Sequence, residues 1–267
     1  MISTIILTKN EEVNLPNCLK SVKWSDEVFV VDSGSTDQTC SIASKFGAKV
    51  FYNKFKGFGE QRNWALDNLP IKSKWILFLD ADEVASLEFY QEIQNTIQRV
   101  NDDTVGFYCC WKLMLNNKWL KHSDFFPRWQ FRIVKVGMGC FEDFGHGQKE
   151  KILSGKIGYI NEPYLHFPFT RGWTYWFEKH NLYSTKEAIE RFSLDVRIRD
   201  LFLNLDRREL AIKYYTARLP FWPVIRFLYG FVVKKGFLDG IPGFIYSINM
   251  SIYEYLIQLK LKEIKKI

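Results

Sequence analysis

The first eighty residues alternate between short apolar runs and stretches in which apolar positions recur every three or four residues. The apolar, β-branched runs predict four buried strands, at residues 3–8, 27–31, 48–52 and 75–79. The intervening stretches have helical spacing and predict three helices, at residues 11–22, 38–46 and 61–69. Strands separated by helices of this length are typical of βαβ units, so the pattern predicts an α/β fold with a mostly parallel central sheet flanked by helices.

The pattern changes after Asp82. Two longer helices are predicted, at residues 87–100 and 173–192. Three further strands are predicted, at residues 104–115, 118–120 and 130–136. We therefore expect a sheet-based domain over residues 1–170 and a helical extension over residues 171–267.

The composition is that of an ordinary folded protein with an unusual number of aromatic residues. Of the 267 residues, 47% are hydrophobic and 25% are charged, which excludes a disordered or collagen-like chain. The aromatic share of 17% is enough for a large core and for additional stacking or interfacial surface. The five cysteines form no CxxC pair, and their odd number excludes a complete set of disulfides within one chain. Reduced thiols in a cytoplasmic protein are therefore expected.

The net charge of +7 is confined to the last part of the chain. Residues 1–196 hold 24 Lys and Arg against 24 Asp and Glu, whereas residues 197–267 hold 13 against 6. A neutral body with a basic tail indicates an anionic partner that only the tail touches, either a nucleic acid or a membrane surface. The N-terminus lacks the basic region and cleavage site of a signal peptide, and no apolar run is long enough to predict a spanning helix.

Polar side chains follow three of the predicted strands at the point where each strand ends. They lie in the segments 8–12, 32–37 and 80–83. In an open parallel sheet, ligands bind beyond the carboxyl ends of the strands. Any one of these segments is equally typical of a helix cap or a solvated turn, but three together favour a ligand site.

Asp80 and Asp82 are the most specific indication of a ligand site, because they come just after the apolar run 75–79. Two carboxylates one residue apart at the rim of a buried strand can share a divalent cation such as Mg²⁺ or Mn²⁺. The glycine-rich signatures of P-loop and dinucleotide-binding proteins are missing from the sequence. The turn 57–59, before Arg62, either brings backbone amides and a guanidinium to a phosphate or is a plain turn.

The ordered set of these motifs resembles that of family 2 glycosyltransferases of the GT-A fold. The resemblance runs from Thr4–Glu12 through Val31–Asp37 and Gln61–Leu66 to Phe78–Glu83, and covers about residues 1–190. It is closest to the bacterial branch that adds sugars to the lipopolysaccharide core or related surface glycans. The resemblance implies a GT-A fold with a C-terminal helical extension, and an inverting transfer from a nucleotide-diphosphate sugar, with UDP favoured as the carrier.

The resemblance also implies roles for individual residues. Five residues would bind the nucleoside and the diphosphate of the donor: Thr8, Asn10, Glu11, Asp32 and Arg62. Asp80 and Asp82 would be the D-x-D pair, with Asp80 also near the donor and Asp82 as the more direct ligand of Mn²⁺ or Mg²⁺. His166 matches the later histidine that completes the metal site in the family, although a core histidine at a strand end is the alternative interpretation.

The general base is less clear, because the sequence departs from the family pattern here. A single displacement needs one group to take the proton of the acceptor hydroxyl. In the lipopolysaccharide branch a His-Glu pair occupies the position of Lys149 and Glu150. We therefore expect Glu150 to be the base, with Asp143 of the Glu-Asp pair second and His146 third.

The basic tail, residues 207–267, mixes Lys and Arg with many aromatic side chains. This mixture is typical of an in-plane contact with an anionic membrane, so a peripheral location on the inner face of the bacterial cytoplasmic membrane is expected. The alternative is that these helices pack on the body or on a second subunit. Nucleic acid is not expected as a partner, because the first 196 residues are neutral overall.

Two other functions fit part of the sequence. A nucleotidyltransferase would share the sheet and the metal, but its first loop should be glycine-rich with a basic residue, whereas residues 8–12 read Thr-Lys-Asn-Glu-Glu. A non-catalytic sugar-nucleotide-binding protein would tolerate loss of the carboxylates, yet Asp80, Asp82 and candidate bases are all present. We therefore expect an enzyme. The resemblance implies that its acceptor is a glycan or a glycolipid.

Overall fold

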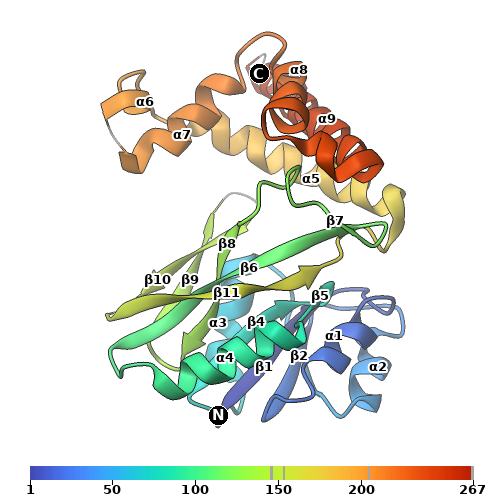
Figure 1. Ribbon diagram of the computed structural model, residues 1–267, viewed down its shortest axis with the longest axis vertical. Coiled ribbons are helices and arrows are strands. Elements are labelled where there is room, and N and C mark those ends of the chain that lie inside the picture. Colours follow the sequence, from blue (N-terminus) through green and yellow to red (C-terminus); the bar gives the residue numbers. More distant parts are fainter. Residues whose placement is uncertain (145–146, 153, 204, 266–267) are drawn as a thin grey trace. The chain divides into compact units, whose positions relative to one another are not determined.

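The computed structural model describes residues 1–144, 147–152, 154–203 and 205–265, which form two compact units (Figure 1). The first unit contains Met1–Met114 and Phe126–Arg171. The second contains Leu115–Phe125 and Gly172–Ile267. The chain thus leaves the first unit for eleven residues, returns to it, and leaves it again at residue 172.

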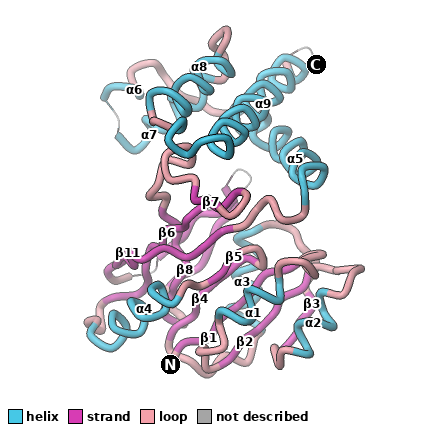
Figure 2. Tube along the Cα trace, turned by 45° about the vertical axis from the view of Figure 1, so that its right-hand side comes forward, coloured by secondary structure: helices cyan, strands magenta, loops and turns pink. Residues whose placement is uncertain are grey.

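The first unit is a mixed sheet flanked by helices (Figure 2). Its main strands are β1 (Ile2–Thr8), β2 (Glu27–Asp32), β3 (Lys49–Tyr52), β4 (Trp75–Asp80), β5 (Glu83–Val84), β6 (Thr104–Leu115), β8 (Trp129–Lys135) and β11 (Lys156–His166). Their order across the sheet is β3-β2-β1-β4-β8-β6-β11-β5. The pairs β3–β2, β2–β1, β1–β4 and β6–β11 are parallel, while β8 is antiparallel to both of its neighbours. The predicted fold class is confirmed.

The helices of the first unit are α1 (Leu15–Ser21), α2 (Thr39–Lys45), α3 (Phe58–Asn68) and α4 (Leu87–Arg99). In Figure 1, α4 lies in front of the sheet and α3 behind it. Ala65 of α3 belongs to the same buried cluster as Ile5, Phe29 and Phe78 of three adjacent parallel strands. The alternation of side chains along a strand therefore gives α3 one apolar face of the sheet to cover.

Strand register brings the polar segments together at one edge. Thr8 is paired with Asp32, and Leu7 is paired with Asp80. Because β1, β2 and β4 run in parallel, their carboxyl ends and the loops that follow lie side by side. At the other side of the sheet, His166 of β11 pairs with Glu83 of β5, two strands that run antiparallel. This pairing brings a residue far along the chain to the loop after β4.

Several elements differ from those predicted. The helix expected over 11–22 begins only at Leu15, because residues 11–14 form a turn in which the Glu11 carbonyl accepts from Leu15 N–H at 2.9 Å. The short strand β5 was not predicted, and of β11 only a strand end at His166 was considered. Also not predicted was the separate hairpin of β9 (Gly139–Phe144) and β10 (Gly147–Ile152), whose polar sequence carries little hydrophobic periodicity.

The second unit is helical except for β7 (Lys118–Trp119). Its elements are α5 (Gly172–Ser193), α6 (Asp200–Leu203), α7 (Leu205–Thr216), α8 (Trp222–Leu228), the π-helical turn η1 (Tyr229–Val233), the 3₁₀ turn η2 (Gly236–Asp239) and α9 (Gly240–Ile264). A small core joins Ala188, Ala217, Ile257 and Leu261. Within the described ranges, no helix is both long enough and apolar enough to cross a membrane.

Candidate functional site

Asp32, at the end of β2, holds its own loop in shape. Its Oδ1 accepts a hydrogen bond from the Thr8 hydroxyl at 3.1 Å and another from the Ser35 hydroxyl. Its Oδ2 accepts from the backbone N–H of Gly34 at 2.9 Å and of Ser35 at 2.8 Å. Asp32 is only 3% exposed. Because the buried carboxylate accepts four hydrogen bonds, this loop at the edge of the sheet has a fixed conformation.

Asn10 and Glu11 connect the first loop to its surroundings. Asn10 has a left-handed backbone, with φ of 56°, a conformation that Asn tolerates better than most residues. Its N–H donates to Ser35 Oγ at 2.7 Å, and its side-chain oxygen accepts from Thr36 N–H at 2.8 Å. Glu11 forms an ion pair with Arg171 at 3.2 Å. Sequence analysis did not find Arg171, since it stands about 160 positions from its partner.

Asp80 is clamped between two buried arginines. Arg62 Nη2 of α3 lies 3.2 Å from Asp80 Oδ1, and Arg132 Nη2 of β8 lies 3.1 Å from Oδ2. Burial opposes ionisation of Asp80, but Arg132 and then Arg62 outweigh it and hold the pKa of this carboxyl well below its usual range. Asp80 is therefore ionised, and each of its oxygens binds one guanidinium group, while its side chain stays 34% exposed.

Arg132 is the central residue that sequence analysis missed. It is 3% exposed, and its Nη2 also bonds Glu83, while its Nε donates to the Tyr164 hydroxyl at 3.2 Å. Glu83 in turn accepts from Asp80 N–H at 2.8 Å. Burial raises the pKa of Glu83 to about 7, against the opposing effect of Arg132. The one signal in the sequence was an arginine inside an otherwise apolar strand run.

Asp82 faces His166 across the loop after β4. Asp82 Oδ2 and His166 Nε2 are 3.5 Å apart, and their side chains are 15% and 24% exposed. Burial lowers the pKa of His166, but Asp82 more than offsets this and raises it above the ordinary value. The structure therefore brings together two of the three residues that the resemblance assigned to the metal.

This pair fits a divalent cation whose remaining ligands come from a substrate. Among the residues that the structure describes, no group of three or more His, Cys, Asp and Glu forms a complete protein site for a metal. Mg²⁺ and Mn²⁺, however, are commonly held by one or two protein groups together with phosphate oxygens and water. One carboxylate and one imidazole, partly exposed at the edge of the sheet, are such a donor set.

Glu150 lies on β10 and is bonded to an aromatic hydroxyl of the main sheet. The Tyr108 hydroxyl of β6 donates to Glu150 Oε1. Burial and this hydrogen bond raise the pKa of Tyr108, so the phenol keeps its proton and remains a donor. The carboxylate of Glu150 is thereby oriented by a group on a different element.

Asp143 lies on β9 and supports α3. Its Oδ1 accepts a hydrogen bond from Gly59 N–H at 2.8 Å, in the first turn of that helix. The turn 57–59 is therefore a helix start whose amide already binds a carboxylate of this chain. His146, the remaining candidate base, lies outside the described residues.

The hairpin that carries both acids is connected to the loop after β4 through Arg62. Gln148 of β10 accepts a hydrogen bond from Arg62 Nη1, while Nη2 of the same guanidinium binds Asp80. Asn63 pairs with both backbone groups of Phe141 in β9, at 2.7 and 2.8 Å. Consecutive residues of α3 thus position the candidate base and the D-x-D loop together.

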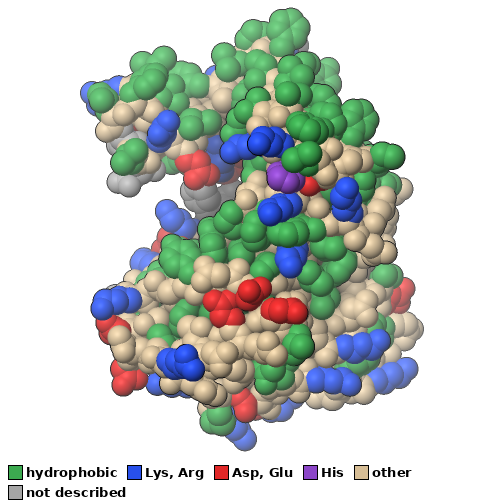
Figure 3. Space-filling view, in the orientation of Figure 1, with side chains coloured by type: hydrophobic (Ala, Val, Ile, Leu, Met, Phe, Trp, Pro, Cys, Tyr) green, Lys and Arg blue, Asp and Glu red, His purple; other side chains and the backbone are tan. Residues whose placement is uncertain are grey.

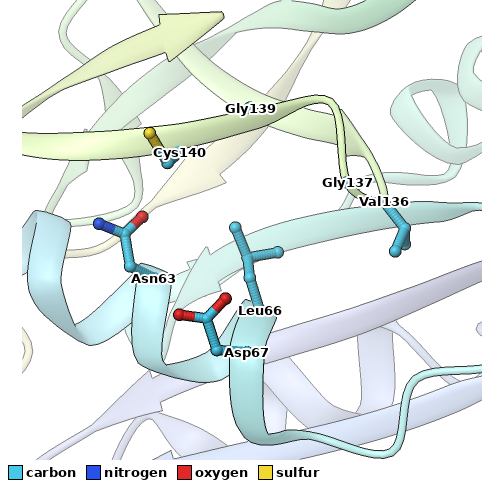
Figure 4. A pocket seen from close by; sticks show the side chains of 7 residues that line it. All are labelled: Asn63, Leu66, Asp67, Val136, Gly137, Gly139 and Cys140. Carbon is cyan, nitrogen blue, oxygen red and sulfur yellow. The ribbon is translucent and has the colours of Figure 1, made fainter. Parts of the chain in front are cut away.

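A separate pocket lies between the end of α3 and the turn from β8 to β9 (Figure 4). It has a volume of about 400 Å³ and is lined by Asn63, Leu66, Asp67, Val136, Gly137, Gly139 and Cys140. Figure 4 shows Asn63, Leu66 and Asp67 of α3 on one side of the pocket and the β9 strand with Gly139 and Cys140 on the other. None of the candidate donor, metal or base residues lines this pocket, so it is not the site described above.

Comparison with known proteins agrees with this geometry. The family model described as Glycosyl transferase family 2 matches residues 3–149. An uncharacterized glycosyltransferase of Rickettsia conorii is 29% identical over 272 residues, covering 98% of this chain and 90% of that protein. The lipopolysaccharide core biosynthesis glycosyltransferase LpsC of Rhizobium meliloti is 24% identical over 267 residues, covering 97% and 91%.

A solved structure supports the fold over nearly the whole chain. The mannosyltransferase PcManGT of Pyrobaculum calidifontis, in complex with GDP-Man and Mn²⁺, matches with a TM-score of 0.54 at 15% identity. The match covers 98% of this chain and 86% of that one. The expected GT-A type of fold is confirmed. The sheet and the loops at its strand ends agree with the family match. The chain belongs to glycosyl transferase family 2 and is a glycosyltransferase enzyme.

Proposed function

We propose that this glycosyltransferase transfers a sugar, with inversion, from a nucleotide-diphosphate sugar to a hydroxyl group of a lipopolysaccharide-core or lipid-linked glycan. The observation that carries the proposal is the Asp82–His166 pair beside the clamped Asp80 at the carboxyl edge of the sheet. The likeness to LpsC favours this class of acceptor. UDP is the preferred carrier on the resemblance of the sequence motifs alone.

The donor binds at the loops after β1, β2 and β4. Thr8, Asn10, Glu11 and Asp32 form or brace the nucleoside pocket, because their mutual hydrogen bonds fix these loops before a ligand arrives. Arg62 contributes positive charge toward the diphosphate side while it binds Asp80. Such preorganisation reduces the entropy lost on binding.

Asp82 and His166 would hold Mn²⁺ or Mg²⁺, with Asp80 beside them. When bound, the cation neutralises charge that develops on the nucleoside diphosphate leaving group. Asp80 keeps its negative charge because two arginines bind it, and an ionised Glu83 supplies the second negative charge that balances the two guanidinium groups beside Asp82. Arg132 and Glu83 hold the loop that carries both aspartates.

Glu150 takes the proton of the acceptor hydroxyl as that oxygen attacks the anomeric carbon. Tyr108 binds Oε1, so Oε2 is the oxygen assigned to the proton. Asp143 is the second candidate, and its bond to Gly59 N–H gives it a structural role in addition. The enzyme acts peripherally on the inner face of the bacterial cytoplasmic membrane, without nucleic acid as a partner.

The first experiment measures thermal stabilisation by UDP, GDP and CMP, each with and without Mn²⁺. A ligand at 100 times its Kd stabilises the folded state by about 2.7 kcal/mol. We expect one nucleoside diphosphate to shift the unfolding temperature, and Mn²⁺ to increase that shift. Asp82→Asn should keep the fold and lose the Mn²⁺-dependent part of the thermal shift. Asp67→Asn, which lies outside the site, should retain that part. A full Mn²⁺ effect in Asp82→Asn would contradict the metal assignment.

Product analysis separates the alternatives. A glycosyltransferase releases a nucleoside diphosphate from the sugar donor, whereas a nucleotidyltransferase joins a sugar phosphate to a nucleotide and releases pyrophosphate. A non-catalytic binding protein would show the thermal shift and neither product. Release of pyrophosphate would overturn the proposed transfer.

A further inference from the structure

The outer side of α9 carries a stripe of exposed apolar residues. Six large side chains on this helix are between 36% and 75% exposed and recur every three or four positions: Ile241, Phe244, Ile248, Ile252, Tyr255 and Leu259. Side chains at this spacing lie along one side of a helix. The stripe therefore runs along five turns of α9 on its solvent-exposed side.

Several polar residues of the same helix point inward, together with the buried Tyr246, Ile257 and Leu261. Ser247 and Asn249 are 2% and 7% exposed. Glu254 forms an ion pair with the buried Arg191 at 2.9 Å. Gln258 donates to two backbone carbonyl groups near the end of α7, at 2.8 and 3.2 Å. A surface helix in water normally exposes a polar side, whereas the exposed side of α9 is apolar.

The exposed apolar area continues onto α8 and the turns before α9. Seven more side chains there are 49–77% exposed: Phe221, Val224, Leu228, Val232, Val233, Phe237 and Leu238. Ring contacts connect this segment to α9, because the ring centroids of Phe227 and Phe231 lie 5.9 and 5.5 Å from that of Phe244. Figure 3 shows hydrophobic side chains gathered over the helices of this unit. We call the exposed residues of 219–248 and the α9 stripe the apolar face.

Charge on the apolar face is positive. Residues 219–248 contain three cations, Arg226, Lys234 and Lys235, and a single acid, Asp239. Asp239 is 3% exposed, and its carboxylate accepts from Ser123 N–H at 2.7 Å, so it faces the interior of the unit. Within the described part of the chain, none of the three cations forms an ion pair with a carboxylate. The apolar face thus presents aromatic and aliphatic side chains with uncompensated positive charge.

We propose that the apolar face docks on the surface of an anionic phospholipid bilayer, with α9 lying in the plane of the membrane. The α9 stripe enters the boundary between headgroups and acyl chains, and Lys234 and Lys235 meet the lipid phosphates. A second copy of this chain would bring like charges together, which disfavours that occupant. The proposal extends the peripheral location proposed above by naming the surface, and its test requires no catalysis.

The experiment is flotation of the full-length protein with two kinds of vesicle. One kind contains phosphatidylglycerol and phosphatidylcholine, and the other contains phosphatidylcholine only. We expect binding to the first that weakens with salt. Phe221→Ser/Ile241→Ser removes the two most exposed apolar side chains of the face, and should abolish most of the binding. Lys234→Gln/Lys235→Asn should weaken it by about 30-fold, from roughly fivefold per cation.

Leu87→Ser/Val136→Ser is the matched control, since it removes two exposed apolar side chains of the first unit. It should bind vesicles as the unchanged protein does. Equal binding by Phe221→Ser/Ile241→Ser, or no binding of the unchanged protein to anionic vesicles, would overturn the proposal. The proposal would also be overturned if the unchanged protein were a dimer in solution and Phe221→Ser/Ile241→Ser were a monomer. Nucleotide-dependent thermal shifts, measured on the same variants, report separately on the proposed catalytic function.

Discussion

At the scale of single residues, the site depends on which carboxylates are already bound by the chain. Asp80 is bound by two arginines, and Asp32 is bound by two backbone N–H groups and two hydroxyl groups. Asp82 instead lies beside a histidine, and Glu150 beside a phenol. Carboxylates of similar appearance in the sequence therefore have different chemical environments, which is what separates structural from catalytic roles.

Arg132→Met tests the clamp on Asp80. Removing one partner of a buried ion pair leaves an uncompensated charge and costs about 3–5 kcal/mol of stability. We expect this loss in urea unfolding, together with weaker Mn²⁺-dependent binding of UDP. Arg132→Met/Glu83→Gln should recover part of the stability, because one of the stranded carboxylates is gone. Arg99→Met, on an exposed part of α4, should change stability by less than about 0.5 kcal/mol.

Glu150→Gln tests the base. General base catalysis contributes about 10²–10⁴-fold, so kcat should fall by that factor while the thermal shift with nucleotide is retained. Asp143→Asn should weaken the start of α3 by about 1 kcal/mol and leave most of the activity. The reverse result, with activity lost in Asp143→Asn and kept in Glu150→Gln, would transfer the role to Asp143.

At the scale of elements, the hairpin β9–β10 is positioned by α3. An added Cβ at Gly59 would lie 2.8 Å from the backbone carbon of Glu142 and 2.9 Å from Asp143 N. Backbone atoms cannot move aside as a flexible side chain can, so this glycine allows the helix and the hairpin to approach each other. The candidate bases depend on this approach for their position.

Gly59→Ala should displace the hairpin from α3. We expect a loss of about 1–3 kcal/mol of stability and a fall in kcat greater than the loss of nucleotide binding. Glu60→Ala, at the next and exposed position of the same helix, serves as the control and should change little. A Gly59→Ala variant with full stability and full kcat would show that the close approach has no role.

At the scale of the whole molecule, the chain forms two units, and the second unit includes a segment that lies between two parts of the first in the sequence. Residues 115–125 come from between two strands of the first unit but belong to the second. Within the second unit, Asp239 anchors this segment by accepting from the N–H groups of His122 and Ser123 and from the Ser123 hydroxyl. A buried carboxylate with several donors is a strong local constraint.

Asp239→Ala should release this segment. Each hydrogen bond to a charged group contributes about 1.5–3 kcal/mol, so the variant should be destabilised by at least that amount. Amide hydrogen exchange at His122 and Ser123 should accelerate more than exchange in β1 or β4 of the first unit. Uniform acceleration across both units would indicate that they unfold together and that the anchor is not local.

The sequence by itself determined the parallel βαβ core, the polar loops at the strand ends and the resemblance to family 2, because these follow from local periodicity and short motifs. It also placed a basic, aromatic tail at the end of the chain. Only the tertiary structure decided that Arg132 and Arg62 meet at Asp80, since 70 positions of sequence separate the two arginines. The tertiary structure also decided that Ser247 and Asn249 of α9 are buried while a stripe of apolar residues on the same helix is exposed. That choice depends on the surfaces of α5, α8 and η2 against which the helix packs, which the pattern of α9 alone does not contain.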